Sequence, residues 1–475
     1  MNYLRYFAGR EDRLVECAIV GTGGFGRSFL AQARHVRGLS CRIAVDRDAA
    51  VAARALVSVG IEPDRIAQCA DRGAALAAWR AGKAVAVADL ALVIDLPFEV
   101  LLEATGNPEA GARHARMAVE AARHVVMVTK ETDSVVGPVL ARMAAERGRV
   151  VTPVDGDQPS LLIGLATWAE VVGLTVIGAG KSSEYDFVFD PAQGTIASNG
   201  RVIPAVGFAD WLSADGRPWP EVAAARARIA AELPQRAVPD LCEMTLVANA
   251  LGLAPDRSDL HAPIARITEI ADLICGEGDG GLLQGRGQLD VFHCLRLPGE
   301  PSFAGGVFVT VRCEDDESWA MLRDKGHVVA RNGRTAMLGL PRHLLGLEAA
   351  TTVFEAALLG CSSGGVAPRQ VIDLTAHADR DLAAGTVLHA KGHHHSIEGV
   401  SGRMTPAAAL GDDVPIPYYL AAGRPLTRNV AAGRPILCSD VALDEGSSLM
   451  ALRRLQDRWM AEDGPVRSGT ETVSA

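Results

Sequence analysis

The sequence lacks a long apolar run, an excess of basic residues and any closely spaced pair of cysteines, and each absence excludes a class of protein. No uncharged apolar run approaches the roughly twenty residues that a membrane span needs. The net charge of -10 argues against a nucleic acid partner, because phosphate binding requires a basic face. Charges appear too early in the first twelve residues for a signal sequence. We therefore expect neither a membrane nor a nucleic acid partner.

The nine cysteines are odd in number, scattered and never arranged as C-x-x-C. Such usage is typical of reduced thiols in a cytosolic protein. Apolar residues make up 48% of the chain and charged residues only 22%, which favours buried, globular structure. A chain of 475 residues is too long for one ordinary core and should form two to four domains. The composition thus predicts a cytoplasmic, globular protein of several domains.

A glycine-rich turn follows the first apolar stretch, Leu14 to Val20, and leads into a helical pattern. In a G-x-G-x-x-G turn at this position, Gly21 makes the tight turn, Gly23 lets the backbone approach a pyrophosphate, and Gly26 allows close packing of helix on strand. The helix N-terminus then faces the phosphates. The residues expected to hold the cofactor here are Gly21, Gly23, Gly24, Phe25 and Gly26.

A second apolar stretch, Cys41 to Val45, ends in Asp46 and Arg47. A carboxylate at this distance from the glycine turn binds the adenosine ribose of a dinucleotide. Asp46 favours NAD, whereas the neighbouring Arg47 could hold the additional phosphate of NADP. The sequence therefore predicts a dinucleotide site and leaves the choice between NAD and NADP open.

Apolar stretches of strand length alternate with helical patterns over the first 150 residues or so. This alternation predicts an α/β fold with a parallel, doubly wound sheet. We assign strands near 93–95, 100–107, 124–130 and 149–154, the second of which ends in turn residues. Helices are expected within 49–81, from Pro108 to about Ala122, and from Val136 to Arg147. Ligands bind beyond the carboxyl ends of such strands. The polar and glycine residues at those ends are Thr105, Gly106, Lys130, Asp155 and Asp157.

The pattern changes after Asp155. An apolar strand over 174–180 delivers Lys181 and Glu184 to its end, and residues 185–240 read as an insertion that covers a site. The stretches 290–296 and 305–312 read as paired strands, which together with a helix over 241–253 indicate an α+β substrate domain. A helical stretch over 343–359 could pack back on the first domain.

An internal repeat occupies the C-terminal part of the chain. Residues 380–388 match residues 428–437, and each copy reads as a short strand, a glycine turn and another strand. The repeat predicts a small, mostly β domain that folds on its own and takes little part in the chemistry. Residues after about Glu462 lack an apolar pattern and are expected to be disordered.

Several motifs together resemble a known family. They lie at 103–108, 155–159, 179–181, 243–250 and 341–348, in addition to the glycine turn. Through them the chain resembles the homoserine-dehydrogenase-like oxidoreductases with a C-terminal SAF domain, and among these the deoxyxylulose-phosphate-reductoisomerase-like enzymes. The resemblance runs from about Val15 to Asp440.

The resemblance implies a domain order and an assembly. A Rossmann domain would comprise residues 1–157, an α+β catalytic domain 158–340, a returning helix 341–365, a β-clip SAF domain 366–461 and a tail 462–475. Subunits of the family often pair through the catalytic domain, which implies a homo-oligomer, either a dimer or a tetramer.

Hydride transfer to a carbonyl needs a proton donor and a positive charge near the oxygen. Lys181, at a strand end, is the first candidate and Lys130 is the second, with a structural lysine as the alternative in each case. Asp157, Glu184 and, less so, Asp155 could bind a divalent ion or orient the lysine, although carboxylates at strand ends are often helix caps. The metal requirement stays open at this point.

Planar donors for an anionic substrate are expected from Arg331, Arg342 and His343, with Asn332 as a further substrate-binding residue and with surface charge as the alternative for Arg334. The run His393 to His395 does not indicate a metal site, since three consecutive residues do not face one ion without an unusual loop. The sequence thus predicts an NAD(P)-dependent oxidoreductase acting on a small, polar, anionic hydroxy or keto compound. The alternatives are a reductoisomerase acting on a sugar phosphate, and a dinucleotide-binding sensor without catalysis.

Overall fold

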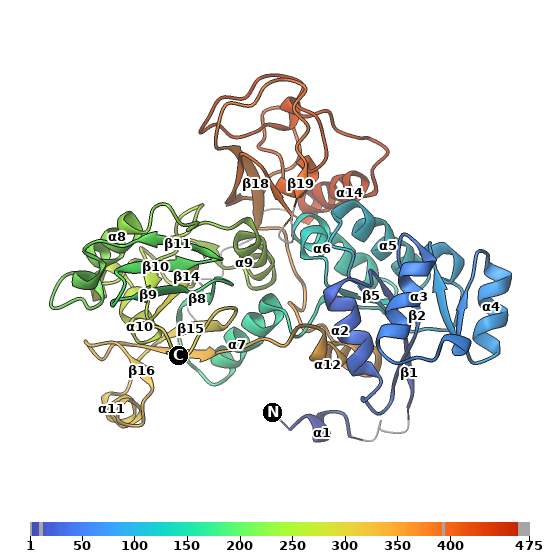
Figure 1. The fold of residues 1–475 in the computed structure, drawn as a ribbon, viewed down its shortest axis with the longest axis horizontal. Coiled ribbons are helices and arrows are strands. Elements are labelled where there is room, and N and C mark those ends of the chain that lie inside the picture. The colour runs from blue at the N-terminus through green and yellow to red at the C-terminus, as the bar shows by residue number, and fades with distance from the viewer. Residues whose placement is uncertain (1, 9–12, 392–394, 464–475) are drawn as a thin grey trace.

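The computed structural model describes residues 2–8, 13–391 and 395–463. Figure 1 shows three parts: a sheet with helices on both faces at the N-terminal end, a second sheet in the middle of the chain, and a C-terminal domain that sits above the junction of the two. Within the described ranges, no helix is both long enough and apolar enough to cross a membrane.

The first part is a seven-stranded parallel sheet in the order β3-β4-β2-β1-β5-β6-β7. This order reverses direction beside β1, as in a doubly wound dinucleotide-binding fold. The α/β fold class predicted from the sequence is therefore confirmed. The strands are β1 (Val15–Val20), β2 (Leu39–Val45), β3 (Ile66–Gln68), β4 (Ala84–Val87), β5 (Val100–Glu103), β6 (His124–Met127) and β7 (Val151–Pro153).

Helices cover both faces of this sheet, and apolar side chains of strands and helices form its two buried layers. The expected strand near residues 93–95 is wrong, because those residues follow a short 3-10 turn after β4, whereas β3 and β4 were not predicted. The helices are α1 (Tyr3–Tyr6), α2 (Gly24–Ala33), α3 (Ala49–Ser58), α4 (Arg72–Arg80), α5 (Pro108–Glu120) and α6 (Lys130–Ala145).

The second part is a mixed sheet in which β14 (Gln288–Arg296) and β15 (Val307–Arg312) lie on either side of β8 (Val176–Ser182). The prediction that β14 and β15 pair with each other is thus wrong, because β8 separates them. The segment expected to be a covering insertion instead extends the sheet. It contributes β9 (Phe187–Asp190), β10 (Thr195–Ser198), β11 (Arg201–Pro204) and α8 (Trp219–Ile229).

Shorter elements complete the second part. These are β12 (Ala254–Pro255), β13 (Ile264–Ala265), α10 (Ile270–Leu273), α11 (Asp316–Asp324), β16 (Val328–Val329) and β17 (Thr335–Leu340).

Two helices join the sheets. α7 (Gln158–Val171) leaves the end of β7, and α9 (Val238–Leu251) packs between α7 and α6 in the centre of Figure 1. Almost every residue of α9 is buried, including the acidic Asp240 and Glu243. A buried carboxylate is costly unless it is paired, so α9 must find cations at this junction.

The chain then returns to the first sheet as the sequence predicts. A 3-10 turn at Leu345–Leu347 packs against α2, and α12 (Ala350–Phe354) joins the buried layer of the first sheet. A side chain at Gly346 would overlap the backbone of Phe25 and Phe29, which explains the glycine at this close approach.

The C-terminal domain contains few regular strands. β18 (Ile372–Ala378) pairs with β21 (Val400–Pro406), and β19 (Ala390–Lys391) pairs with β20 (Ser396–Ile397). The two copies of the repeat contact each other: Asp381 accepts a hydrogen bond from Ala432, and Asn429 accepts one from Ala384. The repeat is therefore a pair of turns related by reciprocal hydrogen bonds rather than two separate hairpins.

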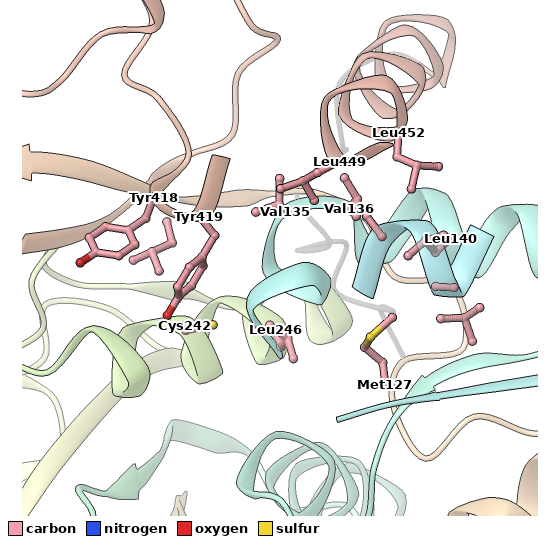
Figure 2. Packing of buried hydrophobic residues seen from close by; sticks show 14 of the residues in the cluster. Met127, Val135, Val136, Leu140, Cys242, Leu246, Tyr418, Tyr419, Leu449 and Leu452 are labelled. Atoms are coloured by element: carbon pink, nitrogen blue, oxygen red, sulfur yellow. The ribbon is translucent and has the colours of Figure 1, made fainter. Parts of the chain in front are cut away.

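The domain is not separate from the rest of the chain. Its last helix, α14 (Ser448–Asp463), packs on α5 and α6, and its N-terminus donates hydrogen bonds to Glu109 of α5. Figure 2 shows Leu449 and Leu452 of α14 beside Val136 and Leu140 of α6.

A short helix, α13 (Tyr418–Ala421), directs Tyr419 toward Cys242 of α9 (Figure 2). Side chains of all three parts thus share one buried cluster. The expectation of an independently folding C-terminal domain does not agree with this packing. α14 also extends into the expected tail, of which residues 464–475 lie outside the described residues.

Candidate active site

A cleft of about 810 Å³ lies at the carboxyl ends of β1, β2 and β5. One wall is the glycine turn and the other belongs to the C-terminal domain, which contributes His389, His395, Tyr419 and Arg424. The size is in the range of small-molecule and cofactor sites. The C-terminal domain is therefore part of this cleft, which the sequence did not predict.

The glycine turn has the geometry that its motif predicts. Gly21 has a positive φ of 91°, and a side chain there would overlap the carbonyl of Ala104. A side chain at Gly26 would overlap the Gly21 carbonyl, so this glycine lets α2 pack on the turn. Nothing lies within 4 Å of the side-chain positions of Gly23 and Gly24, so the space before the α2 N-terminus is open. Phe25 instead packs into the buried layer beside the returning segment.

Asp46 lies in the same cleft at the end of β2. Its Oδ2 accepts hydrogen bonds from the Thr22 hydroxyl at 2.6 Å and the Thr22 amide at 3.0 Å. The Arg47 amide donates to the other oxygen, and Arg47 is exposed at the cleft edge. Thr22 of the glycine turn thus fixes the Asp46 carboxylate within the cleft.

On the other side of β1, Thr105 and Gly106 follow β5 and line the cleft. The Thr105 hydroxyl donates to the buried Glu103, and the Gly106 amide donates to Thr129 at the start of α6. The ends of β5 and β6 therefore meet beside the glycine turn. α6 begins at this point, and Lys130 is its first residue.

Lys130 and Lys181 are brought together by α9. Glu243 accepts a hydrogen bond from Lys130 on one oxygen and from Lys181 on the other. The Lys181 ammonium also lies 2.8 Å from Asp240, and Lys130 lies 3.9 Å from Asp157. The Lys181 side chain is completely buried, whereas 20% of the Lys130 side chain is exposed.

This network fixes the charges of its members. Burial alone would raise the pKa of Glu243, but Lys130 and Lys181 lower it to about 2. Burial alone would lower the pKa of Lys130, but Asp157 and Glu243 raise it well above the usual value. The pKa of Lys181 is raised as well, since the charges of Asp240 and Glu243 outweigh its burial. Both lysines therefore remain ammonium ions at neutral pH.

The expected carboxylate cluster does not form. Asp155 accepts a hydrogen bond from Thr351 of the returning segment, and Glu184 lines a different cavity. Asp157 caps α7, faces Lys130, and has a pKa raised by burial. Among the described residues, no group of three or more histidine, cysteine, aspartate or glutamate side chains could hold a metal ion. His393 and His394 lie outside the described residues.

The predicted substrate residues are only partly at the site. Arg331 and Asn332 lie in the turn before the first residue of β17. Lys181 lies near the other end of this strand, at Leu340. The Arg331 guanidinium stacks over Trp219 instead. Arg342 is exposed. His343 is closer, since it lies beside Gly305 and the buried Gln158 that follows Asp157.

A second cavity of about 280 Å³ lies beside the lysine network, where Asp240, the partner of Lys181, forms part of its wall. Ser183 donates to Asp240 at 2.7 Å on its wall, and Arg236 and Arg403 also line it. The sequence analysis did not select either arginine. They come from the segment before α9 and from the C-terminal domain, so their proximity is a long-range feature.

Residues 238–349 match the family described as "Oxidoreductase DRL, catalytic domain". The matched segment begins with α9 and so includes Asp240 and Glu243 of the network. The chain thus contains an oxidoreductase catalytic domain, and its enzyme class agrees with the sequence-based prediction. A search of curated proteins finds no match.

Solved structures with similar segments include the following three. GenD2 from gentamicin A biosynthesis, in complex with NAD, is 18% identical over 74% of this chain and 88% of its own, with a TM-score of 0.31. Biliverdin reductase from Synechocystis sp. PCC 6803, in complex with biliverdin and NADP+, is 19% identical over 38% of this chain and 48% of its own, with a TM-score of 0.24. A DOX-P reductoisomerase in complex with magnesium is 17% identical over 36% of this chain and 46% of its own, with a TM-score of 0.27.

Apart from GenD2, the similarity spans about half of the length of these structures.

Proposed function

We propose that the protein is an NAD(P)-dependent oxidoreductase that interconverts a small, polar, anionic hydroxy compound and its keto form. The observation that carries the proposal is the ion pair between Lys130 and Glu243. It connects the strand ends beside the glycine turn to the matched oxidoreductase domain. The narrower resemblance to homoserine-dehydrogenase-like enzymes with a SAF domain belongs to this proposal.

The glycine turn fits a dinucleotide. The open space before α2 accepts a pyrophosphate, and the backbone amides there carry the partial positive charge of the helix. Asp46 binds the ribose on the β2 side, so the nicotinamide half extends over β5 toward Gly106. The cofactor supplies or accepts the hydride. We leave NAD and NADP as alternatives, since Asp46 and Arg47 both line the cleft.

Lys130 is the group that stabilises the substrate oxygen in this proposal. It remains charged and is the more exposed of the two lysines. A fixed positive charge stabilises the alkoxide character that develops when the carbonyl accepts hydride. Lys181 acts as a positioning residue, because its buried ammonium holds Asp240 and Glu243 in place.

The anionic character of the substrate is supported by Arg236 and Arg403 in the second cavity, in place of Arg331 and Arg342. Guanidinium groups bind carboxylates and phosphates through paired hydrogen bonds. The carboxylates of the network are bound to lysines, so we derive no step that requires a metal ion.

The experiment is a screen of hydroxy acids, keto acids and polyol phosphates for a change in nicotinamide absorbance, with NAD(H) and NADP(H) in parallel. A substrate that is turned over by the natural chain and at least a hundredfold more slowly by Lys130→Met supports the proposal. Dinucleotide binding without turnover of any compound favours the sensor alternative. A product with a rearranged carbon skeleton favours the reductoisomerase alternative.

A further inference from the structure

His395 reaches the cleft from the C-terminal domain and lies over Gly106 of the first sheet. A side chain at Gly106 would lie 2.5 Å from Cε1 of the imidazole. His395 also has a positive φ of 46°, which residues other than glycine rarely adopt. Such a conformation costs free energy and persists only where surrounding contacts stabilise it, and it is found most often at functional sites.

A carboxylate holds this imidazole. Nδ1 of His395 lies 2.8 Å from Oε1 of Glu131, the residue after Lys130 in α6. Glu131 is buried and His395 is partly exposed, with 34% of its side chain accessible. The carboxylate occupies Nδ1, so Nε2 is the ring nitrogen left for a ligand. Nε2 lies 3.1 Å from the position that a side chain at Gly106 would take, and Gly106 and His395 both line the cleft. No hydrogen-bond partner of Nε2 is found among the described residues.

The two lysines are poorly suited to exchanging protons near neutral pH. Each is bound by two carboxylates that stabilise the ammonium form. His395 differs, since the hydrogen bond to Glu131 raises its pKa above the usual histidine value, while burial and the charge of Lys130 oppose the rise. The other charged or titratable groups that line the cleft away from Asp46 and Arg47 are Glu109, Arg113, His114, His389, Tyr419 and Arg424.

We propose that His395 is the proton donor and acceptor of the reaction, delivered to the nicotinamide half of the cleft by the C-terminal domain and oriented by Glu131. The inference rests on the proposed function. During reduction, the carbonyl carbon accepts the hydride and the carbonyl oxygen takes the proton from Nε2 of His395. The imidazole becomes neutral and keeps the proton on Nδ1, which remains hydrogen-bonded to Glu131. Nε2 then regains a proton from water. Oxidation of the alcohol reverses each transfer.

The first test locates His395 relative to the nicotinamide. Histidine ring signals are followed by NMR against pH, with the His395 signal assigned by its loss in His395→Gln. NAD+ carries a positive ring that ADP-ribose lacks, so NAD+ should lower the pKa of His395 by roughly half a unit or more and ADP-ribose should not. The ring signals of the exposed His327, which precedes β16 in the second part, should be the same in all three states.

The outcomes separate the inference from the proposed function. Binding of both ligands with the same pKa of His395 would refute the inference and leave the dinucleotide site intact. Failure of both ligands to bind would refute the proposed function, and the inference with it.

The second test uses the substrate that the absorbance screen identifies. His395→Gln should lower kcat by roughly 10²- to 10⁴-fold and remove the limb of the pH profile that reports the histidine, with dinucleotide affinity unchanged. Glu131→Gln should retain that limb but move it to lower pH, because the stabilising charge is lost. The matched control His327→Gln should keep the natural profile. An unchanged pH profile in His395→Gln would overturn the proposal.

Discussion

Lys130, the first residue of α6 on the first sheet, forms an ion pair with Glu243, in the middle of α9. Lys181 binds the other oxygen of the same carboxylate from the end of β8. One buried carboxylate therefore joins the two sheets. Substitutions around it should separate the roles of the two lysines.

Lys130→Met should lower turnover by roughly 10²- to 10⁴-fold and leave dinucleotide affinity almost unchanged, because the lost charge acts mainly in the transition state. Lys181→Met should mainly lower the free energy of unfolding, since the buried carboxylates of Asp240 and Glu243 lose the positive charge of the Lys181 ammonium. Steady-state kinetics and denaturant unfolding of both variants measure the two effects. The exposed Lys325→Met is the control. Full turnover in Lys130→Met would contradict the assigned role.

Asp46→Ala should reduce affinity for NAD by roughly 10- to 100-fold, since the ribose loses a hydrogen bond to a charged acceptor. The affinity for NADP should fall less or rise, because the 2′-phosphate no longer meets a carboxylate. Fluorescence titration with NADH and NADPH gives the ratio of the two affinities. This ratio needs no separate control, because a general loss of folded protein would lower both affinities equally. An unchanged ratio would show that Asp46 does not contact the ribose.

Arg453→Met should destabilise the whole chain. Arg453 of α14 is completely buried and forms two hydrogen bonds to Asp373 of β18, at 2.6 and 2.8 Å. Breaking such a pair leaves a buried charge and costs about 3 to 5 kcal/mol. The adjacent Arg454 forms an exposed pair with Glu445, and Arg454→Met should cost about 1 kcal/mol or less. Equal unfolding midpoints for the two variants would contradict this account of α14.

Asp133→Asn should change how stability depends on pH. Asp133 lies in a small cavity between α6, α7 and α9, where burial raises its pKa from 3.8 to about 7. The folded chain then binds a proton that the unfolded chain has released, so stability is lost as pH rises from about 4 to about 7.

Asparagine removes this loss, so the variant should be more stable than the natural chain at about pH 8 and show little gain at about pH 4. Denaturant unfolding at both pH values measures the difference. The exposed Asp64→Asn is the matched control. An equal gain at both pH values would contradict the assigned titration.

The sequence predicted what local patterns determine. The glycine turn, Asp46 and the alternation of strands and helices in the first domain follow from short segments, and the structure has them. Strand β4 was missed because Ala84–Val87 is only four residues long and half alanine, which resembles the adjoining helical stretches.

The partners within the site were not predictable in the same way. Glu184 was chosen as the partner of Lys181 because it is close in sequence, but the actual partners Asp240 and Glu243 are about 60 residues away on α9. His395 is separated from Glu131 by 264 residues. Only the packing of the C-terminal domain on α6 brings these residues together. The only sequence feature that pointed to His395 was the run of three histidines. The sequence analysis did not take this run as a metal site, since three consecutive residues do not face one ion without an unusual loop.

Calorimetric titration of the chain with NAD+ and NADP+ tests the central claim most directly, with Gly23→Val and Gly164→Val as paired variants. Both glycines have open space at the side-chain position, but only Gly23 lines the cleft. The account predicts that the natural chain and Gly164→Val bind one dinucleotide per chain and that Gly23→Val binds none, because valine occupies the position of the pyrophosphate. Unaltered affinity in Gly23→Val, or no binding by the natural chain, would contradict it.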